Sequence, residues 1–292
     1  MAAFEQRRSL RIDAHQHFWH YRPARDTWIT DQMEVLKRDF LPHDLGPELA
    51  ANGIDASIAV QADQSEAETM FLLDLAEANN EIAGVVGWVD LRSPGIAERL
   101  EHFSHYSKLR GFRHIAQSEP DDRFLVGHDL VRGLSQLRPF GFTYDILIYA
   151  PQLPAAIDLV SRVPEQHFVI DHAAKPEIKL KKVDPWTREM RELAQNKNVF
   201  CKLSGLVTEA DPRWKPHDFW PYLDVVLEAF GPDRLMFGSD WPVCLLAASY
   251  AQVVGIVSDY IAGFSETDQD KIVGGNAIRF YGLKTAQYGF AA

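Results

Sequence analysis

Short apolar, β-branched stretches recur at intervals along the whole chain. Runs of this length, separated by turn residues, are typical of buried strands. Eight of them predict strands: LRIDAHQHFW (10–19), ASIAVQA (56–62), AGVVGWVDL (83–91), LRGFRHI (109–115), TYDILIY (143–149), HFVIDHA (167–173), VFCKLSG (199–205) and LMFGSDW (235–241).

Segments with helical spacing of apolar residues lie between these strands. Residues 65–80 are expected to form one such helix, and the pair Ser65 and Glu68 predicts a capping box at its start. The other three clear cases read PAAIDLVSRVP (154–164), WTREMRELAQNKN (186–198) and FWPYLDVVLEAFG (219–231).

The regular alternation of strands and helices predicts βαβ units and a parallel sheet. Eight such units in 292 residues predict an α/β fold of the (β/α)8 TIM barrel type, with residues 1–292 forming a single domain. A doubly wound sheet is the alternative. It is less expected, because no glycine-rich GxGxxG turn follows the first strand.

The composition narrows the possible partners. Hydrophobic residues make up 46% of the chain and charged residues 24%, which is ordinary for a globular protein. A net charge of -11 argues against a nucleic acid as partner, and no apolar stretch is long enough to span a membrane. The N-terminus shows no secretory signal and the chain has only two cysteines. We therefore expect a cytoplasmic protein that acts on a small molecule, in an oligomeric state that the sequence leaves open.

Polar side chains appear where the predicted strands end. The first strand ends in His15 and His17, and a period of two places Asp13 on the same face. The sixth strand switches abruptly from apolar residues to His172, and the eighth presents Asp240. Catalytic groups of a barrel converge at the carboxyl ends of its strands, and imidazole is both a metal ligand and a base near neutral pH. These residues predict an active site.

Four motifs carry a resemblance to a known family. DAHQHFW (13–19), GFRHI (111–115), VIDHAAKP (169–176) and MFGSDWP (236–242) are similar to motifs of the amidohydrolase superfamily. Within it, the chain most resembles the lactonase branch of L-fuconolactonases, L-rhamnonolactonases and 2-pyrone-4,6-dicarboxylate lactonase. The resemblance implies an amidohydrolase-type barrel and a carboxylic ester hydrolase that opens a sugar lactone, L-fucono-1,5-lactone or a related aldonolactone, to the sugar acid.

The chain departs from many members of the superfamily at two strands. The fifth strand has no histidine, and the fourth offers Arg113 where a bridging lysine or carboxylate is common. A two-metal centre is therefore not expected. The set His15, His17, His172 and Asp240 suffices for one divalent ion such as Zn²⁺, but the branch also contains members that work without metal. Both possibilities stay open.

The resemblance also assigns roles. It implies that Asp240 is the general base, while the three histidines serve the metal or the developing oxyanion. Side chains expected to contact the substrate are Arg113, Tyr144, Trp19, Trp28 and Lys202. Structural alternatives remain for several of them: a salt bridge at the rim for Arg113, an ion-paired strand lysine for Lys202, and packing under the loops for the tryptophans.

Three other functions are less expected. A metal-dependent decarboxylase of the same superfamily is disfavoured by the missing fifth-strand histidine. A pyrone dicarboxylate lactonase would need more cationic groups at the mouth than Arg113, Lys175 and Lys202. A binding protein without activity is disfavoured because four polar groups remain at the strand ends.

Overall fold

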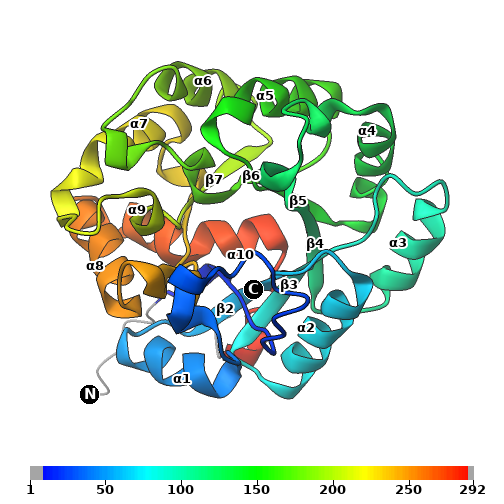
Figure 1. The fold of residues 1–292 in the computed structure, drawn as a ribbon, viewed down its shortest axis with the longest axis horizontal. Coiled ribbons are helices and arrows are strands. Elements are labelled where there is room, and N and C mark those ends of the chain that lie inside the picture. Colours follow the sequence, from blue (N-terminus) through cyan, green and yellow to red (C-terminus); the bar gives the residue numbers. More distant parts are fainter. Residues whose placement is uncertain (1–8, 289–292) are drawn as a thin grey trace, which may run out of the picture.

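The computed structural model describes residues 9–288, and their strands form one eight-stranded sheet. Consecutive strands pair in parallel, in the order of the sequence (Figure 1). The strands are β1 (Ile12–Gln16), β2 (Ala56–Val60), β3 (Ile82–Gly87), β4 (Leu109–His114), β5 (Thr143–Ile146), β6 (Phe168–Ile170), β7 (Val199–Leu203) and β8 (Leu235–Phe237). Each lies inside or within a residue of a predicted strand, because the apolar runs follow the buried barrel wall.

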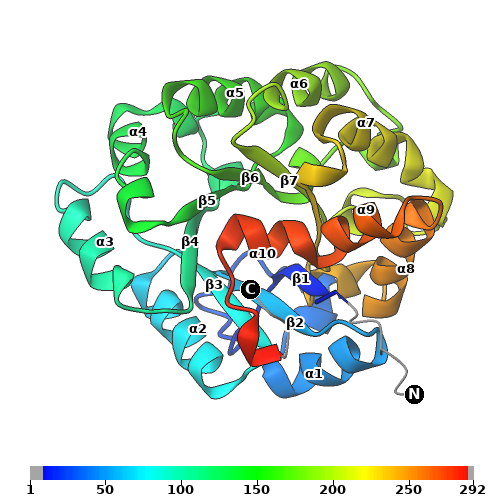
Figure 2. The same cartoon turned by 180° about the vertical axis from the view of Figure 1, so that it is seen from behind.

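The helices surround this sheet and one of them crosses its end. They are α1 (Pro42–Ala51), α2 (Glu66–Ala78), α3 (Ile96–Ser104), α4 (His128–Leu134), α5 (Leu153–Arg162), α6 (Trp186–Leu193), α7 (Trp220–Phe230), α8 (Tyr250–Ile261), α9 (Glu266–Asp270) and α10 (Asn276–Tyr281). Figure 2 shows α10 lying across the barrel on the face opposite to that of Figure 1. None of the helices in residues 9–288 is long and apolar enough to cross a membrane.

The last strand meets the first, so the sheet is nearly closed. Gln16 and Trp241 form a parallel bridge, and the backbone N–H of His17 donates to the carbonyl of Trp241 at 2.7 Å. The N–H of Asp240 donates to the carbonyl of His15 at 2.8 Å. The (β/α)8 barrel is thus confirmed and the doubly wound alternative is wrong. Closure also brings the predicted histidine pair beside the predicted carboxylate.

Two apolar clusters hold the fold together. The larger one lies between strands and surrounding helices, and includes Phe112 and Phe168. The smaller one joins strand residues such as Ile12, Phe200 and Met236 to Phe280 of α10. Because neighbouring side chains of a strand alternate between the two sides of the barrel wall, the second cluster fills the barrel interior toward its amino end.

The predicted helix starts are mostly confirmed, and the capping box is half correct. The Ser65 side chain accepts a hydrogen bond from the backbone N–H of Glu68, as a capping box requires. The Glu68 carboxylate, however, accepts from the N–H of Ala62 instead of that of Ser65. It therefore ties the end of β2 to α2.

Candidate active site

A β-bulge in β1 directs its histidines. Ile12 and Asp13 pair with Ala56 and Ser57 of β2, but the next paired residue is Gln16, opposite Ala59. One residue of β2 thus faces two of β1, which breaks the period of two. The prediction that Asp13 and His15 share a face is therefore wrong, because the bulge turns the two side chains to different sides. The Asp13 carboxylate accepts from the Tyr250 hydroxyl of α8 at 3.0 Å.

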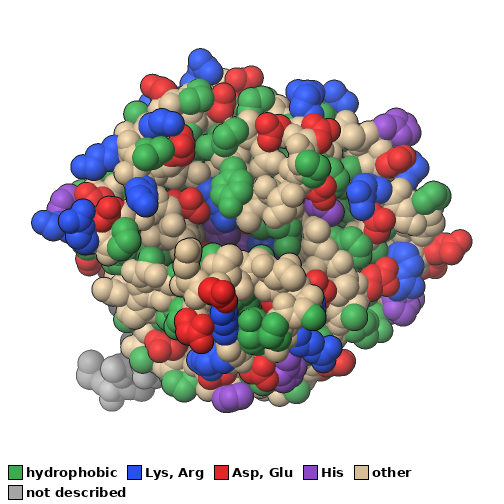
Figure 3. All heavy atoms as spheres, viewed as in Figure 1, with side chains coloured by type: hydrophobic (Ala, Val, Ile, Leu, Met, Phe, Trp, Pro, Cys, Tyr) green, Lys and Arg blue, Asp and Glu red, His purple; other side chains and the backbone are tan. Residues whose placement is uncertain are grey.

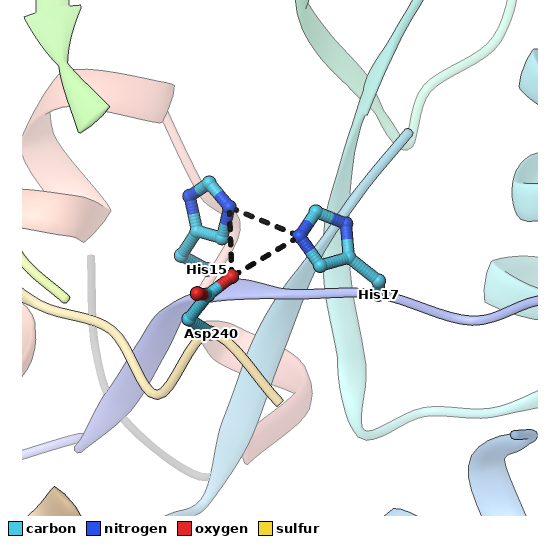
Figure 4. A group of neighbouring side chains, drawn as sticks. All are labelled: His15, His17 and Asp240. Carbon is cyan, nitrogen blue, oxygen red and sulfur yellow. Dashed lines mark hydrogen bonds and ion pairs between the residues drawn. The ribbon is translucent and has the colours of Figure 1, made fainter. Parts of the chain in front are cut away.

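Four of the predicted residues converge in the barrel mouth. His15 Nε2 and His17 Nε2 lie 3.2 Å apart, and Asp240 Oδ1 lies 3.9 Å from the first and 3.4 Å from the second (Figure 4). His172 Nε2 is 3.8 Å from the same carboxylate oxygen. All four side chains are buried. Figure 3 shows a hollow in this face of the molecule, with histidine side chains visible in it.

The geometry of His15, His17 and Asp240 suits one divalent metal ion. Two ligand atoms of a tetrahedral zinc site lie about 3.3 Å apart, since each bond is about 2.0–2.1 Å long. Two of the separations in this group, 3.2 Å and 3.4 Å, are close to that value, and the third is 3.9 Å. Nδ1 of His17 lies 2.7 Å from the carbonyl oxygen of Val60, which can only accept. Nδ1 therefore carries the hydrogen, and Nε2 offers its lone pair to the group.

A second donor group is less suited to a metal. His15, Asp171 and His172 also lie close together, so the predicted four-ligand set is divided between two groups that share His15. Asp171 is already paired with cations: Lys202 Nζ lies 3.0 Å from its Oδ1, and Arg113 Nη1 lies 3.1 Å from its Oδ2. A divalent ion there would meet two positive charges. The donor set thus supports a metal between His15, His17 and Asp240.

Burial and charge set the protonation states of the site. Burial lowers the pKa of His15 well below its ordinary value and that of His172 to about 4. Both imidazoles are therefore neutral near pH 7, and each has one ring nitrogen without a hydrogen. Burial opposes ionisation of Asp240, but the surrounding histidines, His172 first, hold its pKa below the ordinary value. The site thus presents an ionised carboxylate among neutral histidines.

Strained backbone places two of these side chains. His172 has φ of 54° and Asp240 has φ of 58°, in the left-handed region that residues other than glycine rarely adopt. Such strain concentrates at functional sites, at a cost of about 1–3 kcal/mol per residue. Gly205 leaves the space that the His172 ring fills, because a Cβ there would overlap the imidazole. The His172 Nδ1 in turn lies 2.8 Å from the Ser204 hydroxyl.

A chain of buried charges lies beneath the histidines. Lys202 Nζ is 2.5 Å from Asp145 Oδ2 and 3.1 Å from His15 Nδ1, and its side chain is fully buried. Arg113 Nη1 lies 3.2 Å from His15 Nε2, and the Arg113 Nη2 donates to the carbonyl of Gln61. Both cations therefore support His15 from inside the barrel. Their predicted contacts with substrate are not supported, because the protein itself engages their nitrogens.

The predicted aromatic contacts are placed differently as well. Tyr144 is fully buried and packs edge-on against Phe168 in the larger cluster, because it is Asp145, one position later, that faces inward. Trp19 is 1% exposed and donates to the carbonyl of Arg38. These placements do not support substrate contact. Trp28 is 40% exposed and packs edge-on against Trp19, so it remains the one predicted aromatic at the surface.

Two charged residues near Asp240, Lys175 and Glu209, were not predicted to contact the substrate. Lys175 follows His172 in the left-handed turn, with its Nζ 4.0 Å from Glu209 Oε1 and 5.2 Å from the Tyr149 ring centre. The charge of Asp240 acts on the pKa of both Lys175 and Glu209. In the sequence, the one sign that Lys175 belongs to the site is its position shortly after the end of β6. Glu209 follows the end of β7 by several residues, and no local pattern indicates that it belongs to the site.

The chain is similar to known proteins over nearly its whole length. The family model described as Amidohydrolase matches residues 12–283. A curated L-fucono-1,5-lactonase of Burkholderia multivorans is 46% identical over 289 residues, 94% of this chain and 97% of the relative. A curated L-fucono-1,5-lactonase of Burkholderia ambifaria is 36% identical over 284 residues, 94% and 96% of the two chains.

A solved structure extends the likeness to three dimensions. The crystal structure of an amidohydrolase from Burkholderia multivorans with bound zinc has a TM-score of 0.90 to this chain, at 46% identity. The match covers 94% of this chain and 100% of that one. The family expected from the four motifs is confirmed, and the chain belongs to the amidohydrolase family.

Proposed function

We propose that this protein is an enzyme that hydrolyses a sugar lactone, L-fucono-1,5-lactone or a related aldonolactone, to the sugar acid. Two L-fucono-1,5-lactonases at 46% and 36% identity over nearly the whole chain support the reaction class and the substrate class. The observation that carries the chemistry is the ionised carboxylate of Asp240, set beside His17 and the neutral His15 and His172 at the mouth of the barrel.

Asp240 is the proposed general base. Its Oδ1 faces the histidines, whereas no other residue in the described range 9–288 forms a hydrogen bond or ion pair with its Oδ2. The Oδ2 takes a proton from the water whose oxygen attacks the lactone carbonyl. A tetrahedral oxyanion forms, the bond between the carbonyl carbon and the ring oxygen breaks, and the ring oxygen receives the proton back from Asp240. The products are a carboxylic acid and a hydroxyl on one open chain.

We further propose that the metal is zinc, held by His15, His17 and Asp240. The zinc-bound relative and the separations within this donor group support that assignment. A bound zinc ion supplies a Lewis acid at the carbonyl and lowers the pKa of water. Lys202 and Arg113 fix the His15 ring from below. His172, oriented by Ser204, lies beside His15 and the same Asp240 oxygen and donates to the oxyanion.

A neutral, hydroxylated ring fits the mouth better than a dicarboxylate. Arg113 and Lys202 are neutralised by Asp171 and Asp145, which leaves Lys175 as the cation beside Asp240 in the described residues. Glu209, opposite Lys175, would repel a second carboxylate. Lys175, Glu209 and Tyr149 offer donors and acceptors to sugar hydroxyls. Decarboxylation gains no support either, since β5 contributes Asp145 paired with Lys202 where a ligand histidine would be needed.

The test is acid release from a panel of L- and D-aldonolactones, followed with a pH indicator beside measurement of bound zinc. We expect turnover of L-fucono- or L-galactono-type lactones well above the spontaneous rate. Asp240→Asn should lose about 10²–10⁴-fold in kcat, since it removes the general base. Asp259→Asn is the matched control, because Asp259 is exposed on α8.

Two results would contradict the proposal. Full activity of Asp240→Asn would show that Asp240 is not the general base. Inactivity of the wild type on every lactone would show that sugar lactones are not the substrates. The zinc assignment has its own test. The purified protein should contain about one zinc per chain, and His17→Asn should lose it while remaining folded; zinc content unchanged in that variant would refute the site.

A further inference from the structure

A cavity opens at the end of the barrel opposite the histidines. Its volume is about 270 Å³, and its wall includes the first residues of β4 and β5 together with the end of α10. Figure 2 shows α10 crossing this face. Three arginines line it: Arg110, Arg138 and Arg279. On a chain of net charge -11, three guanidinium groups around one cavity are a local reversal of sign.

Arg110 is a cation without a carboxylate partner. Its guanidinium makes no hydrogen bond or ion pair with another residue in the part of the chain that the structure describes, and its Nε is buried without an acceptor. Burial lowers the pKa of Arg110, with no nearby charge contributing to the shift. Arginine nonetheless stays protonated in proteins. An unpaired positive charge on a half-buried side chain is costly unless a partner binds.

The other two arginines leave room for an anion. Arg138 pairs with the exposed Glu165, at 3.1 Å, and also donates to the Glu165 backbone carbonyl. Arg279 donates to the carbonyl of Asp233 and to the Asn276 side chain, both uncharged acceptors. One carboxylate therefore faces three guanidinium groups, which leaves an excess of positive charge.

Gln166 adds an acceptor to this set of donors. It lines the same cavity, is 1% exposed, and its amide nitrogen donates to the carbonyls of Phe142 and His167. Those two bonds fix the orientation of the amide, and its Oε1 remains buried without a partner. An acceptor of this kind requires a hydroxyl or N–H on the ligand, which a simple carboxylate or inorganic anion lacks.

We propose that this cavity is a binding site for a small hydroxycarboxylate, with the carboxylate between Arg110 and Arg279 and a hydroxyl directed to Gln166. A volume of 270 Å³ is large enough for a ligand of this class. The site is separate from the catalytic mouth, because Arg110 and Thr143 lie at the amino ends of their strands and the histidines at the carboxyl ends.

Isothermal titration with gluconate tests the site without any lactone. We expect saturable binding by the wild type and none of the uncharged analogue sorbitol. Arg110→Met should weaken gluconate binding at least about tenfold, because it removes a charge-assisted contact and keeps the aliphatic stem. Arg138→Met, at the more exposed rim, should weaken it less and serves if Arg110→Met does not fold.

Matched controls separate the cavity from the rest of the surface. Arg213→Met, at an exposed arginine paired only within its own loop, should bind gluconate like the wild type. Lactone turnover should be unchanged in Arg110→Met, which distinguishes failure of this proposal from failure of the proposed reaction. Absence of gluconate binding, equal binding of sorbitol, or binding undiminished in both Arg110→Met and Arg138→Met would overturn the proposal.

Discussion

The two halves of the barrel interior differ in chemistry. Toward the amino ends of the strands the interior is apolar, with Ile12, Phe200 and Met236 packed against α10. Toward the carboxyl ends it holds buried charges instead. Along β7 alone the inward side chain changes from Phe200 to the fully buried Lys202. One wall of strands thus supports both a hydrophobic core and a set of ion pairs.

This difference separates stability from positioning. Apolar burial stabilises the fold in proportion to area, at about 25 cal/mol per Å². Buried ion pairs give little net stability, because the cost of desolvation offsets their attraction. Removal of one partner nevertheless destabilises the fold strongly, because the other charge stays buried without a partner. The apolar half, toward the amino ends of the strands, therefore provides most of the stability of the fold. The charged half, toward the carboxyl ends, lowers that stability but holds His15 in a fixed position. Substitutions in the two halves should have different signatures.

The largest effect is expected for Lys202→Met. It leaves Asp145 and Asp171 as buried carboxylates without their shared cation, at a cost of about 3–5 kcal/mol in the free energy of unfolding. Urea denaturation measures the loss, and adding Asp145→Asn should restore part of it. Lys197→Met, at an exposed lysine just before β7, is the control and should be neutral. If Lys202→Met unfolded at the same urea concentration as the wild type, the ion pairs of Lys202 would not contribute to the stability of the barrel.

Gly205→Ala should affect both stability and catalysis. An alanine at a φ of 61° costs about 1–2 kcal/mol, and its Cβ would displace the His172 ring. We expect kcat/KM to fall at least about tenfold. Gly141→Ala imposes similar strain at a φ of 76° but meets open space, so it should lose stability and keep activity. Equal activities of the two variants would show that the position of His172 does not matter.

The smallest effect is expected for Ile12→Val, in the apolar half of the strand that carries His15. Loss of one methyl group from a fully buried site should cost about 0.5–1.5 kcal/mol, with kcat/KM unchanged. Thermal unfolding measures the loss of stability, and lactone turnover by the same preparation tests whether kcat/KM is unchanged. A fall in turnover as large as that of Gly205→Ala would break the division between the two halves.

The sequence was sufficient for the barrel and for the residues at strand ends. Strand positions follow from apolar runs that must be buried on both faces, and the histidine pair stood out as polar residues closing such a run. Side-chain direction was harder to predict. The bulge in β1 turned Asp13 away from His15, and Tyr144, expected to contact the substrate, packs in the larger apolar cluster.

Contacts between distant strands were the other gap. Lys202 was expected to contact the substrate because it lies near the end of a predicted strand, with an ion-paired lysine as the alternative; the structure pairs it with Asp145 of β5 and Asp171 after β6 inside the barrel. No local pattern reveals that three such residues face one another. Likewise Lys175 and Glu209 meet only because the turns after β6 and β7 are neighbours in the closed barrel.

The bridge between Gln16 and Trp241 has a consequence for biosynthesis. His15 and Asp240 lie near opposite ends of the described chain, and they meet only when β8 closes onto β1. A growing polypeptide on the ribosome cannot assemble this pair until residue 240 has been synthesised and has left the exit tunnel. Chains that end before Asp240 therefore lack the pair, and an ion bound between the two residues would join the first strand to the last and hold the barrel closed.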